Sequence, residues 1–314
     1  MLRSIIQRAH NLYIGPKPQV KKNGGVRYVF DTKPPLKPLL KKINSIFFRR
    51  THFPPYLTGS IAGRDFIANV EVHKGARVVI TEDIAQFFDC ITEQHVYRIW
   101  REFFRFSDEI ADLLTHLMTK DGRVFQGTPT SSYLANLAFW DFEPQLVNRL
   151  AARGIRYSRY VDDISISTTN DLSDSEKRWV VAQIYAMIGR GGFKPQRSKH
   201  QYLSSARPIT IMGLNANSSR APTITRRERS RIRALIFQLE QRFASGETGP
   251  EFRQSLSHAI GKVGRLKRLH KVEGAALRTR LDTIQAALDA LPVKTKASAK
   301  FESPPADAID DHPF

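Results

Sequence analysis

Two adjacent aspartates join two β-rich runs in the segment IRYSRYVDDISIS, residues 155–167. The β-branched and aromatic residues on either side of Asp162 and Asp163 are typical of a β-hairpin. Two like charges this close repel each other and resist burial, and a bound divalent cation offsets both effects. Aspartate is also a common turn residue, so a bare pair most often marks an ordinary polar turn. The hairpin constrains the fold, and its function depends on its surroundings.

A further carboxylate follows a second strand-like run. Asp83 lies just after the apolar residues 78–80, which suit a buried strand. A carboxylate on a strand next to the hairpin would complete a hard-oxygen site suited to Mg²⁺. Two such ions about 4 Å apart activate an attacking hydroxyl and stabilise a leaving phosphate oxygen. Asp83, Asp162 and Asp163 are therefore the candidate catalytic residues.

The overall charge favours a polyanionic partner. The 314 residues include 49 Lys+Arg and 30 Asp+Glu, a formal net charge of +19. Such an excess favours nucleic acid over a membrane surface or no partner. With 41% hydrophobic residues the chain has enough apolar material for a sizeable core, which excludes general disorder. The single cysteine, Cys90, excludes an internal disulfide framework.

Hydropathy predicts no membrane span and no signal peptide, and no membrane partner is expected. No apolar run approaches the roughly 20 residues of a membrane span, and the first residues lack the apolar stretch of a signal peptide. A cytoplasmic protein is the default prediction.

Hydrophobic periodicity and turn residues predict the order of elements. Residues 51–76 are expected to be rich in loops. Strands are expected at 26–30, 78–83 and on both sides of Asp162-Asp163, with a strand–turn–strand region at 199–217. Helices are expected at 36–49, 93–118, 132–150 and 174–190.

The last quarter of the chain is predicted to be helical and basic. A capping box at residues 225–228 opens a helix to about 246, and further helices are expected at about 250–270 and 273–291. Residues 226–300 contain 17 Lys/Arg and 7 Asp/Glu, a net of +10 (17 − 7). Residues 293–314 lack periodicity and end acidic, which predicts disorder.

Three segments resemble the catalytic boxes of reverse transcriptases, in the family's order. They are DIAQFF at 83–88, QGTPTS at 126–131 with LANL at 134–137, and YVDD at 160–163. The resemblance extends over about residues 20–220. It includes KNGGVR at 22–27, GR at 63–64, the segment from 192 to Lys199, and MGL at 212–214.

The resemblance implies a right-hand polymerase of mixed α/β (α+β) class. Residues 1–80 would form an N-terminal extension and fingers. Residues 81–217 would form a palm with an antiparallel sheet, and fingers-derived helices would be inserted at about 93–135. Residues 218–292 would form a basic helical thumb.

By the same resemblance, Asp83 and Asp162 would hold two Mg²⁺ ions, for which Mn²⁺ is a possible substitute. The Ile84 carbonyl would assist, and Asp163 would complete the carboxylate set. One ion would lower the pKa of the primer hydroxyl and the other would hold the triphosphate.

The resemblance also implies a dNTP site. Arg64 and Lys199 would stabilise phosphate charge. Phe88 would lie under the incoming sugar and exclude a 2′-hydroxyl, and Gln126 and Gly127 would line the pocket. The alternatives are a core aromatic for Phe88 and a plain surface lysine for Lys199.

Within the family, NVEVH at 69–73 is similar to the Asn-Ala-x-x-His element of retron reverse transcriptases, with Val70 in place of alanine. Asn69 and His73 are therefore either RNA contacts or a hydrogen-bonded structural pair. The retron Val-Thr-Gly element is retained only at Gly213. Tyr160 would lie near the primer end or simply fill a strand.

Basic residues of the predicted thumb are candidate RNA contacts, and the alternative is that they only form a solvated surface. They would recognise a structured stem-loop of a cognate noncoding RNA by shape, through phosphate contacts. The residues are Arg226, Arg229, Arg233, Arg265, Lys267 and Arg268.

A retron enzyme would be an RNA-directed DNA polymerase. The resemblance implies priming from a 2′-hydroxyl of a guanosine in the RNA, a branched RNA–DNA product (msDNA), an effector or toxin protein as partner, and a role in anti-phage defence. One alternative is another bacterial defence-associated reverse transcriptase, of the abortive-infection type, with different priming. A second is a template-independent or protein-primed DNA polymerase of the defence type, and a third is a non-catalytic RNA-binding scaffold.

Overall fold

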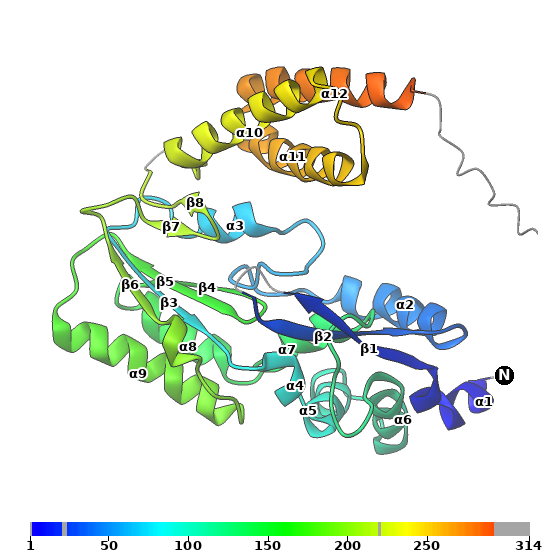
Figure 1. Ribbon diagram of the computed structural model, residues 1–314. Coiled ribbons are helices and arrows are strands. Elements are labelled where there is room, and N and C mark those ends of the chain that lie inside the picture. The colour runs from blue at the N-terminus through cyan, green and yellow to red at the C-terminus, as the bar shows by residue number, and fades with distance from the viewer. Residues whose placement is uncertain (1, 21–23, 219–220, 292–314) are drawn as a thin grey trace, which may run out of the picture. The chain divides into compact units, whose positions relative to one another are not determined.

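The structure is a computed structural model that describes residues 2–20, 24–218 and 221–291 (Figure 1). The chain divides into two compact units, Met1–Arg226 and Arg227–Phe314. The first contains the predicted fingers and palm, and the second holds most of the predicted thumb. The boundary at residue 80 between the fingers and the palm stays a prediction. The disorder predicted for residues 293–314 concerns residues outside the described ones.

A four-stranded antiparallel sheet forms the centre of the first unit, in the order β4-β5-β3-β6. Its strands are β3 (Val78–Asp83), β4 (Arg156–Tyr160), β5 (Asp163–Thr168) and β6 (Gln201–Ser204). The predicted hairpin around Asp162-Asp163 is confirmed as β4–β5. Strand β3 pairs with β5 on one side and β6 on the other, which places the two predicted carboxylate strands next to each other.

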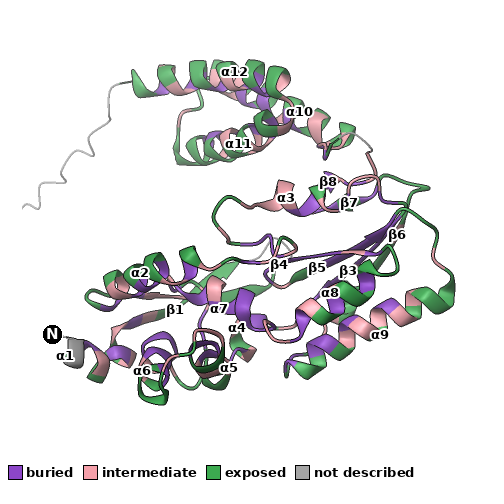
Figure 2. Ribbon diagram, turned by 180° about the vertical axis from the view of Figure 1, so that it is seen from behind, coloured by how far each residue is buried: buried purple, intermediate pink, exposed green. Residues whose placement is uncertain are grey.

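Different elements cover the two faces of this sheet (Figures 1 and 2). Helices α8 (Glu143–Ala151) and α9 (Asp174–Arg190) lie on one face. Helix α3 (Phe66–Glu71) and the hairpin of β7 (Thr210–Ile211) and β8 (Leu214–Asn215) lie on the other. A capping box between Ser173 and Glu176 opens α9.

The N-terminal part pairs β1 (Tyr13–Val20) with β2 (Val26–Thr32) in an antiparallel hairpin. Helices and helical turns surround it, and several of their aromatic side chains pack on Trp100, which is fully buried. These elements are α1 (Leu2–Gln7), η1 (Ala9–Leu12), α2 (Leu36–Ile46), η2 (Phe48–Arg50), α4 (Phe87–Cys90), α5 (Glu93–Arg98), the π-helix η3 (Ile99–Phe103), α6 (Asp108–Met118) and α7 (Ser131–Leu137).

Three predictions of secondary structure were wrong in detail. The helix expected at 93–118 is broken after η3, where Arg105 has a φ of +61° that a right-handed helix cannot contain. The helix expected at 132–150 is two helices, and Pro144 lies in the first turn of the second. The loop expected at 51–76 contains α3, because Asp65 caps it by accepting from the backbone N–H groups of Ile67 and Ala68.

In its described residues, the second unit contains three helices, as the apolar spacing predicts. They are α10 (Arg226–Ala244), α11 (Pro250–Leu269) and α12 (Lys271–Asp289). Their apolar stripes, which include Ile236, Leu239, Val263 and Leu281, are buried against one another. In the described part of the chain, no helix is long and apolar enough to cross a membrane.

Candidate active site

Asp83 and Asp163 are direct cross-strand partners at one end of the sheet. Val161 takes a left-handed conformation, with a φ of +62°, and so turns the chain between β4 and β5. The Ile84 N–H then donates to the Asp162 carbonyl at 3.2 Å, which ties the turn to the end of β3. The fold therefore brings the three predicted carboxylate residues to one end of the sheet.

The electrostatics of this end are those of crowded carboxylates. Asp83 is 6% exposed, and the Lys199 ammonium donates to its Oδ2 at 2.6 Å. Asp163 keeps solvent access at the start of β5. Even so, removal of water by the surrounding protein, and then the charges of Asp162 and Asp83, raise the pKa of Asp163 to about 7. A cation at this position would favour the ionised form.

A cleft of about 390 Å³ opens beside these residues. Thr81, Glu82 and Asp83 line it from β3. Of these, Thr81 and Asp83 point to the same face of the sheet, because alternate residues of a strand do so. The lining also includes Asp163, Ser165, Lys199, Gln201, Thr210, Ile211 and Met212. The cleft therefore joins the carboxylate end of the sheet to the β7–β8 hairpin.

The donor set fits Mg²⁺ in its chemistry, since the ion prefers carboxylate and carbonyl oxygens. Asp83, Asp162, Asp163 and the Ile84 carbonyl would hold it. Their side chains do not already converge on one point: among the described residues, no group of three or more His, Cys, Asp or Glu could hold a metal ion as it stands.

A buried ion pair holds the turn between β4 and β5 through a hydrogen bond to its backbone. Arg159 of β4 is 0% exposed, and its Nε and Nη2 lie 2.6 and 2.7 Å from the two carboxylate oxygens of Glu143. The same guanidinium donates to the carbonyls of Val161 at 3.0 Å and Asn136 at 2.9 Å. It thus links the turn to the LANL segment. Sequence analysis missed this residue, although an arginine inside a buried strand is a usable indication.

The QGTPTS segment connects to the N-terminal hairpin. The Phe30 N–H donates to the Gln126 carbonyl at 2.8 Å. Gly127 has a φ of +107°, and a Cβ there would collide with the Phe30 carbonyl oxygen. Glycine is therefore required for this close approach, beside a second cleft of about 490 Å³ lined by Lys17, Lys37 and Lys41 among others.

Phe88 and Phe87 differ in their surroundings. Gln86 has a φ of +47° and precedes α4, which carries both rings. Phe87 is 3% exposed and stacks on Phe139, so it belongs to the core. Phe88 is half-buried, so part of its ring is accessible, as the proposed contact with the sugar requires.

Comparison with known proteins assigns the family. Residues 16–216 match the family described as Reverse transcriptase (RNA-dependent DNA polymerase). Over 289 residues the chain is 35% identical to the retron Se72 reverse transcriptase of Salmonella heidelberg (strain 579083-10), covering 90% of this chain and 76% of that protein. This chain belongs to the retron reverse transcriptases. It is an RNA-dependent DNA polymerase by family, as the three boxes predict.

Other relatives agree with this assignment. The retron Ec48 reverse transcriptase of Escherichia coli is 29% identical over 279 residues, which cover 84% of this chain and 68% of that protein. The apo telomerase of Candida tropicalis is similar in fold, with a TM-score of 0.50 at 12% identity over 88% of this chain and 59% of that one. The predicted fold class, a mixed α/β reverse transcriptase fold, is confirmed.

In this retron reverse transcriptase, the Arg64 side chain forms hydrogen bonds with backbone carbonyl groups. Its guanidinium donates to the carbonyls of Phe53 and Leu57, each at 2.7 Å, and also to that of Pro54. The prediction that Arg64 contacts phosphate is not supported in this conformation, because the side chain stabilises the loop at 53–57.

Asn69 and His73 are buried, at 1% and 0% exposure, which favours the structural alternative over RNA contact. The two ring nitrogens of His73 lie 2.8 Å from Ser167 Oγ and 2.7 Å from Ser158 Oγ. Asn69 Oδ1 accepts from Ser158 Oγ at 2.8 Å, and its Nδ2 lies 3.5 Å from Met212 Sδ. These residues therefore join α3, the sheet and the β7–β8 turn.

That turn contains Met212 and Gly213, both with positive φ, at +49° and +73°. The departure from the retron Val-Thr-Gly element thus keeps glycine where the backbone favours it. Tyr160 is half-buried and pairs with Asp163 across the hairpin. Roles for Tyr160 and Gly213 in holding the primer stay predictions.

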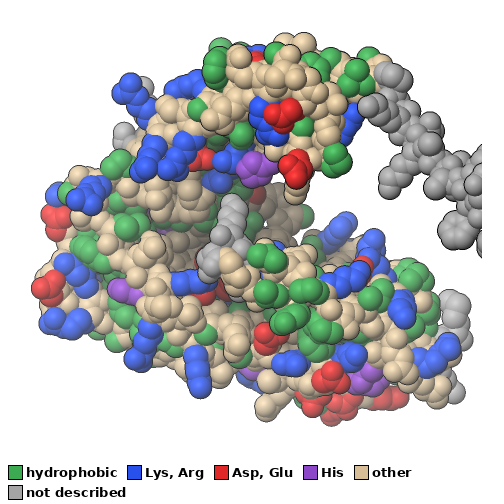
Figure 3. All heavy atoms as spheres, in the orientation of Figure 1, with side chains coloured by type: hydrophobic (Ala, Val, Ile, Leu, Met, Phe, Trp, Pro, Cys, Tyr) green, Lys and Arg blue, Asp and Glu red, His purple; other side chains and the backbone are tan. Residues whose placement is uncertain are grey.

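Two of the arginines predicted to bind RNA form ion pairs within the second unit. Arg229 and Arg233 both pair with Glu273, at 2.8 and 2.5 Å, so each would have to leave or share this partner to contact RNA. Arg226, Lys267 and Arg268 are exposed and Arg265 is half-buried. Lysine and arginine side chains are spread over the face in Figure 3 rather than gathered in one patch.

Proposed function

We propose that this enzyme copies part of a cognate structured noncoding RNA into DNA at the site of Asp83, Asp162 and Asp163. The DNA stays joined to the RNA as a branched product. The observation that carries the proposal is the register that places Asp83 opposite Asp163, with Asp162 in the adjoining turn. Membership of the retron family supports the nature of the product.

In the reaction, a hydroxyl attacks the α-phosphorus of a dNTP and pyrophosphate leaves. Asp83, Asp162, Asp163 and the Ile84 carbonyl would hold two Mg²⁺ ions, whose charge would lower the pKa of that hydroxyl and neutralise the triphosphate. Asp83, Asp162 and Asp163 supply the negative charge that attracts and orients the cations. Lys199 moves from Asp83 to the triphosphate as the carboxylate gains another partner. Phe88 lies against the sugar, and Gln126 and Gly127 bound the pocket of the base pair.

The RNA partner binds chiefly through phosphate contacts of the basic thumb residues, which predicts affinity that falls steeply with salt. The first nucleotide is added to a 2′-hydroxyl of a guanosine within the RNA, as the resemblance implies. A partner effector protein, a function in anti-phage defence and action in the cytoplasm complete the proposal.

The test removes one negative charge at the site. Asp162→Asn is expected to abolish DNA synthesis on a primed RNA template and the DNA that copurifies with the protein. Asp171→Asn is the matched control, because Asp171 is exposed and pairs only at the surface with Arg77. Retained synthesis by Asp162→Asn would contradict the proposed site. Defence retained without synthesis would instead favour the RNA-binding scaffold.

A further inference from the structure

A third cleft lies on the opposite face of the four-stranded sheet from Asp83. Its volume is about 500 Å³, within the range of sites for small ligands. Along β3, Ile80 points into this cleft while its neighbour Thr81 lines the carboxylate cleft. The two clefts are therefore separated by the thickness of the sheet.

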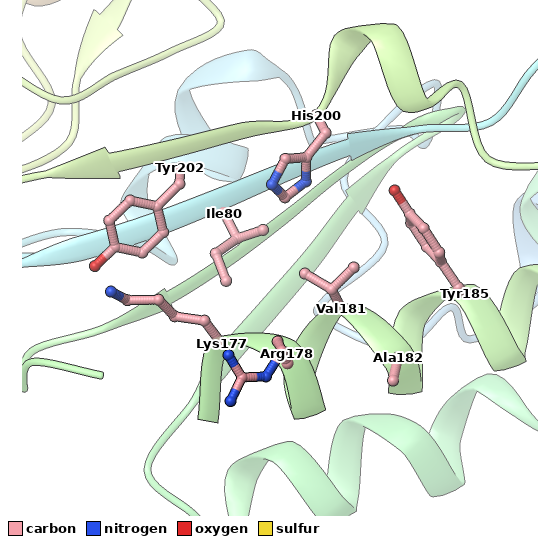
Figure 4. Close-up of a pocket in the computed structure, with 8 residues that line it drawn as sticks. All are labelled: Ile80, Lys177, Arg178, Val181, Ala182, Tyr185, His200 and Tyr202. Atoms are coloured by element: carbon pink, nitrogen blue, oxygen red, sulfur yellow. The ribbon is translucent and has the colours of Figure 1, made fainter. Parts of the chain in front are cut away.

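Two tyrosines flank the cleft (Figure 4). Tyr202 extends from the edge strand β6 on one side, and Tyr185 extends from α9 on the other. Ile80 and Val181 lie between them and form an apolar floor with Ala182. Tyr202 is 40% exposed, so one of the two rings is open to a ligand.

Basic groups line the same cleft. Lys177, Val181 and Tyr185 recur at intervals of four on α9 and so share one face of that helix. The Lys177 ammonium lies 4.5 Å from the Tyr202 ring centroid, and Arg178 adds a second positive charge. Arg197 lies 5.8 Å from the Tyr185 ring centroid.

The acidic groups nearby are already partnered. Glu82 is buried beneath the cleft, where His200 Nδ1 lies 2.6 Å away and the Tyr185 hydroxyl donates at 3.3 Å. Asp174 pairs with Lys177 at 2.9 Å. From 174 to 204 the chain contains six Lys/Arg and two acidic residues, a net of +4 (6 − 2). The segment that forms most of the cleft is thus positive.

We infer that this cleft binds single-stranded DNA, with a base against Tyr202 and phosphates near Lys177 and Arg178. Aromatic rings beside cations are how proteins hold single strands without reading their sequence. A sugar that lies on the floor formed by Ile80, Val181 and Ala182 would find no hydrogen-bonding partner there for a 2′-hydroxyl, because the polar side chains of the cleft flank this floor. The cleft therefore suits the DNA product rather than the RNA. This inference rests on the proposed function for the source of the DNA.

The experiment uses the full chain and a short oligo(dT) in which one thymine is 5-iodouracil, a photocrosslinking base. We expect crosslinks to map to peptides containing Tyr202 or Tyr185. Tyr202→Leu should reduce their yield about fivefold or more, in line with the loss of one base stack. Arg178→Gln should also lower the yield. Arg149→Gln, which removes the same charge from an exposed position on α8, should not.

Three outcomes would overturn the inference. One is a set of crosslinks that maps only outside the cleft. Another is a crosslinking yield that neither Tyr202→Leu nor Arg178→Gln changes, which would favour a protein partner for this cleft. The third is equal crosslinking by the matching oligo(rU), which contradicts the preference for DNA. Elongation on a generic primed RNA, measured in parallel, should persist in Tyr202→Leu. Because Asp162→Asn leaves the cleft intact, crosslinking by that variant separates failure here from failure of the catalytic assignment.

Discussion

The guanidinium of Arg159 and the carboxylate of Glu143 form a bidentate ion pair that is almost completely enclosed, with side-chain exposures of 0% and 1%. Burying two charges is costly, and the additional carbonyl contacts of Arg159 are what make it tolerable. Because one of these carbonyls belongs to Val161, the pair connects the core to the turn that carries Asp162. Stability and the geometry of the site therefore depend on the same residues.

Glu143→Gln should destabilise the first unit by about 3–5 kcal/mol, because it leaves the Arg159 charge buried without its partner. Urea unfolding followed by circular dichroism measures the change. Glu102→Gln is the control, since Glu102 is 46% exposed in its pair with Arg98 and should cost no more than about 1 kcal/mol. Equal effects of the two variants would contradict the structural role of Arg159.

His73 should make the enzyme less stable in acid. Burial, with a smaller effect from the charge of Arg156, lowers the pKa of His73 to about 3. In the unfolded chain a histidine titrates near 6.5, so below that pH the unfolded state binds an additional proton. Stability from this group is complete above about pH 6.5. It is lost as the pH falls toward 3, by up to about 1.4 kcal/mol per pH unit.

The measurement is the difference in unfolding free energy between pH 7.5 and 5.5, for the parent and for His73→Gln. The parent should lose more stability than the variant, because other titrating groups cancel in the comparison. The same loss in both proteins would show that His73 does not titrate as described.

Lys199→Gln should raise the KM for dNTP more than it lowers kcat, because the ammonium is expected to serve the triphosphate once it leaves Asp83. Steady-state kinetics on a primed RNA template separate the two constants. Lys194→Gln is the control, as Lys194 is an exposed lysine five residues earlier. An unchanged KM would assign Lys199 to its contact with Asp83 alone.

Phe88→Ala should admit ribonucleotides, because it removes the ring that is proposed to exclude a 2′-hydroxyl. The ratio of kcat/KM for NTP to that for dNTP should rise by about tenfold or more, equivalent to about 1.4 kcal/mol of lost discrimination. Phe103→Ala removes another half-buried ring from the same unit and should leave the ratio unchanged. If both variants keep the ratio of the parent, Phe88 is a packing residue.

Local sequence patterns predicted the elements that carry the carboxylates. Strand periodicity placed Asp83 at the end of β3, and the β-rich runs around Asp162 predicted the hairpin. The register that places Asp83 opposite Asp163 depends on the pairing of strands 80 residues apart, and neither the local pattern nor the resemblance specified it.

The remaining differences arise from tertiary contacts. The carbonyls around Arg64 and the serines around His73 come from segments distant in sequence, so neither burial nor partners could be read from local pattern. For Arg159, its position inside a buried strand was a local indication, but its partner Glu143 lies on a different element and could not be read from local pattern. The helix predicted over 93–118 failed at Arg105, where packing of neighbouring aromatic rings accompanies a left-handed turn.

The most direct test of the central claim is to purify the protein from its host, extract the bound nucleic acid, and treat it with RNase, DNase and a debranching enzyme. Synthesis on a cognate RNA predicts a discrete DNA of uniform length. RNase should shorten the species without destroying it, and debranching should release the DNA. Heterogeneous DNA with no attached RNA, or RNA alone, would contradict the proposed function.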